Sequence, residues 1–167
     1  MVQIENLIEK TPSFKQITAD LQPKNHQLIT GISGSARTEL LSALSKEGQR
    51  PILVVTDTIS HMQELASDLE NLLPANRVYQ FPVEEVLAAE VATSSPNYRL
   101  QRVLALNALI NNEPAVVVAS AAGLRRNIIS PEYFAQSSLK IKTGGEVDPV
   151  KIRQQLSAMG YQYQKMV

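Results

Sequence analysis

Two runs of β-branched residues constrain the fold of this chain more than any other feature. "ILVVTD" covers residues 52–57 and "AVVVAS" covers residues 115–120. Both runs are continuously apolar and do not alternate with polar residues. This pattern is typical of strands that are covered on both faces, as in parallel sheets flanked by helices. We therefore expect two buried strands of one parallel sheet.

Helical patterns separate these runs along the chain. An apolar stripe with helical spacing extends from Ile59 to Leu73, and a second helical segment runs from Tyr98 to Asn111. Between them, "RVYQF" at residues 77–81 is a short strand candidate. Alternating strands and helices with right-handed crossovers predict an α/β fold, in which helices cover both faces of a parallel sheet.

The N-terminal part shows three further signals. Thr11 and Pro12 fit the N-cap and the first position of a helix. Residues 28–30, Leu-Ile-Thr, have the composition of a short strand, and residues 36–47 have the pattern of a helix. Together they predict a strand, a glycine-rich turn and a helix in succession.

This strand, turn and helix resemble a phosphate-binding loop of the form GxxxxGK[ST]. In "LITGISGSARTELL", Gly31 is the first glycine, Gly34 adds freedom to the turn, and Thr38 is the hydroxyl residue. Ala36 stands where the second glycine is needed for close approach of the backbone, and Arg37 stands for the lysine. The sequence predicts a vestigial, degenerate phosphate loop that keeps the framework and does not bind nucleotide. Weak phosphate binding and an active ATPase are the alternatives.

The carboxylate of an ATPase site is also missing. An acid of this kind follows a buried strand, but "AVVVAS" ends in Ala119 and Ser120. Asp57 follows the other run, and capping of the next helix is the simpler role for it. His61 is expected to face solvent without a carboxylate partner, and Arg125 with Arg126 forms either an anion contact or an exposed loop pair. We therefore predict no catalytic residue in this chain.

After about residue 125 the pattern changes. "SSLKIKT" alternates apolar and polar residues, which predicts a strand with one solvated face. Asp148 and Pro149 predict a helix start, and Gly160 its end. We expect an α/β domain over residues 1–125 and the start of a smaller α+β domain over residues 126–167.

Composition limits the remaining classes of function. The chain has no Cys and no apolar run long enough to span a membrane, so we expect a cytoplasmic protein without thiolate metal sites. Residues 1–97 hold 7 Lys and Arg against 12 Asp and Glu, whereas residues 98–167 hold 9 against 4. The basic C-terminal part fits nucleic acid, an acidic partner or ordinary surface charge.

Four segments together resemble a known family. They are "ITGISGSARTELL", "PILVVTDTISHMQELASDL", "PAVVVASAAGLRRNIISPEYF" and "LKIKTGGEVDPVKIRQQLSAMGYQYQKMV". Their order and spacing are similar to the N-terminal, UvrB-like region of the bacterial transcription-repair coupling factors (Mfd). UvrB itself carries a complete phosphate loop, and a long tyrosine-rich hairpin where this chain has only the short segment between Phe81 and Arg99. The resemblance implies a UvrB-like scaffold that has lost both the complete phosphate loop and the tyrosine-rich hairpin.

The resemblance also implies partners. In this family the region presents a surface to UvrA and recruits it to a stalled RNA polymerase. In this chain that surface includes Tyr161, Gln162, Tyr163 and Lys165. ATP, Mg and DNA belong to a downstream motor of the full-length translocase, and no cofactor is expected here. The alternative is a fragment of an ATP-dependent UvrB or helicase-type repair enzyme.

Overall fold

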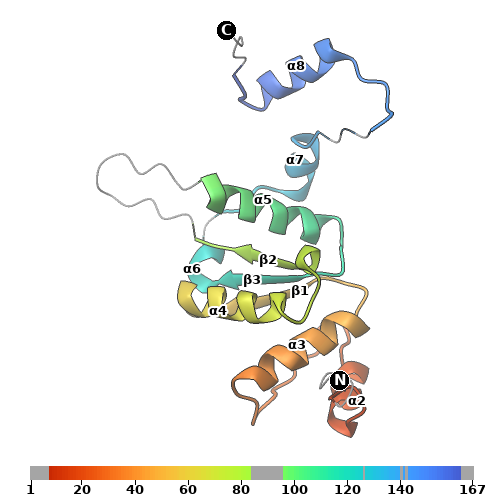
Figure 1. The fold of residues 1–167 in the computed structure, drawn as a ribbon, viewed down its shortest axis with the longest axis vertical. Helices are drawn as coiled ribbons and strands as arrows, with labels where there is room; N and C mark the ends of the chain where they lie inside the picture. The colour runs from red at the N-terminus through yellow and green to blue at the C-terminus, as the bar shows by residue number, and fades with distance from the viewer. Residues whose placement is uncertain (1–7, 84–95, 126, 140, 142, 163–167) are drawn as a thin grey trace, which may run out of the picture. The chain divides into compact units, whose positions relative to one another are not determined.

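The computed structural model describes residues 8–83, 96–125, 127–139, 141 and 143–162. The chain divides into two compact units, Met1–Asn127 and Ile128–Val167. Figure 1 shows the elements of each unit in chain order. The two units are described separately below.

A parallel sheet lies at the centre of the first unit. Its strands are β1 (Ile52–Thr56), β2 (Val78–Phe81) and β3 (Val116–Ser120). The order across the sheet is β1-β3-β2, and both neighbouring pairs are parallel. Val116 of β3 stands in register with Ile52 on one side and Val78 on the other. The predicted α/β fold with a parallel sheet is therefore confirmed.

Helices cover the sheet on both sides, as predicted. Helix α4 (Ile59–Glu70) and helix α5 (Pro96–Ile110) lie on opposite sides of it (Figure 1). Successive residues of β3 point alternately to the two sides. Val116 and Val118 join the cluster that contains α4 residues, whereas Val117 and Ala119 join the cluster that contains Ala105 of α5. Strand β3 is accordingly buried throughout.

Strand β1 departs from the prediction of burial on both faces. Ile52 and Val54 pack in the cluster of α4, but Leu53 is 47% exposed and Val55 is 52% exposed. The two exposed residues lie opposite Val117 and Ala119 in the register, on the side that α5 covers over β2 and β3. A continuous apolar run does not distinguish a central strand from one with a single covered face.

Two helices precede the sheet. Helix α2 (Pro12–Ala19) starts as predicted, because the Thr11 hydroxyl accepts a hydrogen bond from the Phe14 N–H and Pro12 occupies the first helical turn. Helix α3 (Ser35–Glu47) follows after a loop. Phe14 of α2 packs with Leu40 and Ala43 of α3 in a small apolar cluster.

The predicted strand at Leu28–Thr30 is wrong. The structure assigns no strand to these residues, and Leu28 is 90% exposed. Three residues of strand-like composition form a strand only when a neighbouring strand pairs with them, because the ladder supplies the hydrogen bonds of the backbone. The described sheet contains β1, β2 and β3 only.

A compact connection lies at the carboxyl ends of β2 and β3. Helix α6 (Ala121–Leu124) follows β3 directly at this end, whereas the short 3-10 helix η1 (Ala75–Arg77) leads into β2 at the opposite end of the strand. The Arg102 guanidinium of α5 stacks on the Phe81 ring at 3.9 Å from its centroid. It also donates a hydrogen bond of 2.8 Å to the Pro82 carbonyl. This arginine therefore ties α5 to the end of β2.

The second unit contains α7 (Pro131–Gln136) and α8 (Pro149–Ala158). Helix α8 begins and ends as predicted: Asp148 accepts hydrogen bonds from the N–H groups of Val150 and Lys151, and Gly160 has a φ of +89° beyond the C-cap. The strand predicted over "SSLKIKT" is not seen in the described residues of that segment. Ile141 there is 62% exposed. Alternation favours a strand only where a second strand pairs with it.

Among the described residues, the structure contains no helix that is both long enough and apolar enough to span a bilayer.

Candidate functional site

The turn that resembles a phosphate loop is open and held by two glycines in the left-handed region. Gly31 has a φ of +79° and Gly34 a φ of +54°. A Cβ on either residue would meet no atom within 4 Å. These glycines are therefore needed for their backbone conformation and not for close packing at their own Cα positions.

Helix α3 starts at the end of this turn with Gly34 as its N-cap. Ala36 and Arg37 are exposed in the first helical turn, whereas Thr38 is buried at 4% exposure. A phosphate loop needs the threonine hydroxyl at the metal and a cation aimed at the phosphates. Here the threonine is withdrawn from solvent, and the cation is an arginine at an open surface.

The carboxyl end of β3 carries no acid. Ser120 is fully buried there, and its hydroxyl accepts a hydrogen bond from the Gly123 N–H as the N-cap of α6. This serine fixes the start of a helix and faces no solvent. The position where an ATPase places a metal-binding carboxylate is thus occupied by a structural hydroxyl group.

The carboxyl end of β1 carries a pair that the sequence analysis missed. The Asp57 carboxylate lies 2.6 Å from Nδ1 of His61 and also accepts a hydrogen bond from the Thr58 N–H. Thr58, not Asp57, is the N-cap of α4, because its hydroxyl accepts from the His61 N–H. The expectations that Asp57 caps the helix and that His61 has no carboxylate partner are both wrong. The spacing of four residues at a helix start is the signal that identifies such a pair.

The pair changes the protonation of both groups. The hydrogen bond to Asp57, and then its charge, raise the pKa of His61, and Glu64 adds to the rise while Arg37 opposes it. The hydrogen bond to His61 holds the pKa of Asp57 below its ordinary value. Both side chains are exposed, so solvent screens their attraction.

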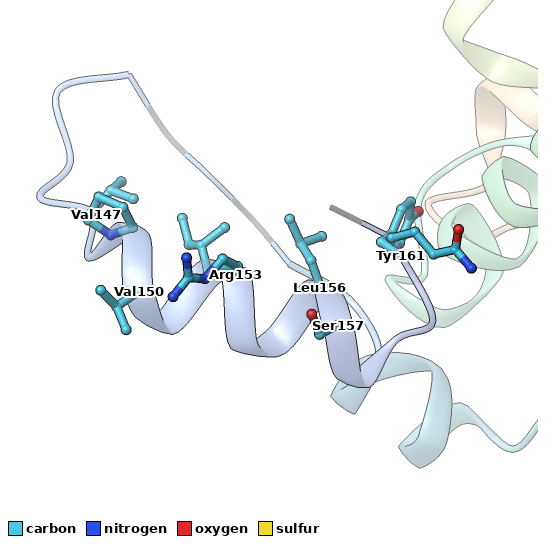
Figure 2. Close-up of a pocket in the computed structure, with 9 residues that line it drawn as sticks. Val147, Val150, Arg153, Leu156, Ser157 and Tyr161 are labelled. Carbon is cyan, nitrogen blue, oxygen red and sulfur yellow. The ribbon is translucent and has the colours of Figure 1, made fainter. Parts of the chain in front are cut away.

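In the second unit, Tyr161 and Gln162 line an apolar groove along α8 (Figure 2). The groove has a volume of about 550 Å³, and Val150 and Leu156 contribute to its wall. Arg153 is the one charged residue among its described lining residues. Tyr161 is 67% exposed beyond the C-terminal end of α8. The structure thus brings two of the four predicted partner-binding residues together on one surface.

Most of the other sequence candidates lie outside the described residues. Tyr163 and Lys165 lie outside the described residues, as do Arg126 and most of the segment between Phe81 and Arg99. Arg125 is exposed at the C-cap of α6. Over the described ranges, no group of three or more His, Asp or Glu side chains is arranged to hold a metal ion.

The fold and the turn define an α/β lobe with a parallel sheet and a loop of phosphate-loop spacing that lacks the second glycine and the lysine. Comparison with known proteins gives a narrower class. The whole chain is 34% identical over 168 residues to the transcription-repair-coupling factor of Bacillus subtilis. It is 23% identical to that of Staphylococcus aureus strain RF122 and 24% identical, over 98% of the chain, to that of Staphylococcus haemolyticus.

The chain is thus a relative of the transcription-repair-coupling factors along its whole length, which confirms the resemblance seen in the sequence. It spans about 14% of the length of these relatives. No protein-family model matches the chain.

Proposed function

We propose that this chain is a non-catalytic, UvrB-like interaction module from the N-terminal region of a cytoplasmic transcription-repair coupling factor. The module helps to recruit UvrA to a stalled RNA polymerase in transcription-coupled nucleotide excision repair. The observation that carries the proposal is the similarity of the entire chain to proteins named transcription-repair-coupling factor. Contacts with RNA polymerase and DNA belong to the full-length protein.

The absence of catalysis in this module is the first part of the proposal. The proposal assigns an ATP-dependent motor with its Mg to the part of the full-length protein outside this chain, which spans about 14% of the length of its relatives. Three observations on the turn support this division: Ala36 replaces a glycine, Arg37 replaces the lysine, and Thr38 is buried. Residues 28–30, before the turn, are also not paired into the described sheet.

Titration calorimetry with Mg-ATP tests this part. We expect no micromolar binding by the isolated chain. The double variant Ala36→Gly with Arg37→Lys restores the sequence motif, and it should remain without micromolar affinity because Thr38 stays buried. Micromolar binding by the unmodified chain would instead favour the rival function, a fragment of an ATP-dependent UvrB or helicase-type repair enzyme.

The UvrA surface is the second part of the proposal. We place it in the second unit at Tyr161, Gln162, Tyr163 and Lys165, with the vestigial turn taking no part. Among the described residues, the exposed Tyr161, which lines the same groove as Arg153 and Leu156, supports this placement. Aromatic residues and arginine are enriched at protein interfaces, where a few such side chains supply most of the binding energy.

A matched pair of tyrosine variants tests this surface in the full-length coupling factor. Tyr161→Ala should weaken UvrA binding about tenfold or more, the loss that corresponds to about 1.4 kcal/mol. Tyr133→Ala is the control, because Tyr133 is similarly exposed in the same unit and lies outside the groove lining. Surface plasmon resonance with immobilised UvrA gives both affinities.

The outcomes separate the recruiting function from the placement of its surface. If the unmodified coupling factor shows no UvrA binding, the recruiting function is wrong. If it binds and both tyrosine variants bind equally well, recruitment stands and the placement of the surface at Tyr161 is wrong.

A further inference from the structure

We draw no further inference here: the strongest candidate, the apolar side of β1 on which Leu53 and Val55 are about half exposed, carries none because nothing in the described residues shows what covers it.

Discussion

The imidazole Nδ1 of His61 and the carboxylate of Asp57 lie 2.6 Å apart, and their hydrogen bond joins the end of β1 to the first turn of α4. A partner of this kind stabilises the protonated imidazole, so the pKa of His61 is raised. We predict that Asp57→Asn lowers the pKa of His61 towards its ordinary value. Titration of the imidazole ¹H resonances by NMR measures the change.

The same pair predicts a pH window of stability. The contribution from His61 is complete below its ordinary value of 6.5 and disappears as pH rises through the raised pKa. The contribution from Asp57 is complete above its ordinary value of 3.8 and disappears as pH falls through the lowered pKa. The stability difference between the unmodified chain and His61→Gln should therefore be largest between these two values. Urea denaturation over a pH series, at low and high salt, measures it, and a difference that increases above neutral pH would contradict the assignment.

Two leucines test the unequal cover of the sheet. Leu69 of α4 is fully buried in the main apolar cluster, whereas Leu53 of β1 is 47% exposed. Leu69→Ala should lower the free energy of unfolding by about 2–5 kcal/mol, since it removes buried apolar surface and leaves a cavity. Leu53→Ala should lower the free energy of unfolding by less than about 1 kcal/mol. Urea denaturation followed by far-UV circular dichroism compares them, and equal losses would mean that β1 is covered on both sides.

A glycine in α6 is predicted to be irreplaceable for steric reasons. A Cβ on Gly123 would lie 3.0 Å from the Phe81 carbonyl oxygen and 3.3 Å from the Pro82 carbonyl carbon. Both contacts are backbone atoms of the β2 end, so Gly123→Ala should cost about 1–3 kcal/mol of unfolding free energy through overpacking. Ala122→Ser at the exposed neighbouring position should stay within about 0.5 kcal/mol. Thermal and urea denaturation of the two variants measure these two changes in the free energy of unfolding.

The cap of α8 predicts a local effect in the second unit. Asp148 accepts from the N–H groups of Val150 and Lys151, so Asp148→Ala leaves both donors without this partner. The expected loss is about 1 kcal/mol of helix stability. Hydrogen exchange at the amides of α8 should become faster, while the amides of β3 in the first unit keep their rates. Ser157→Ala, in the same helix and away from the cap, serves as the comparison.

Local chemistry explains which elements were predictable from the sequence. The Val-rich run of β3 predicts a buried strand, and it is one. The caps of α2 and α8 are predicted correctly because the side chains of Thr11 and Asp148 accept hydrogen bonds from N–H groups only a few positions away. Such short-range interactions depend on residues that lie close together in the sequence.

Most of the wrong predictions concern interactions between distant segments. Leu28–Thr30 has the composition of a strand, but strand formation needs a partner, which composition does not specify. The continuous apolar sequence of β1 predicts burial on both faces, whereas Leu53 and Val55 are exposed. At the candidate site, the glycine-rich turn is predictable from its residues. The burial of Thr38 is not, because it depends on how α3 packs against the rest of the unit. The Asp57–His61 pair is the local exception, and its sequence signal is the spacing of four residues at a helix start.

The strand order β1-β3-β2 has a consequence for synthesis of the chain on the ribosome. The last strand to be made, β3, separates the first two, so neither β1 nor β2 has its neighbour until Val116–Ser120 has emerged. Val116 is the register partner of both Ile52 and Val78. A nascent chain that ends before Val116 therefore cannot form either strand pair of this sheet. Pairing between such distant segments is slow to form. Until β3 is made, the cluster that contains the apolar residues of α4 and β1 lacks Val116 and Val118, so we expect these residues to expose more apolar surface during translation than in the finished fold.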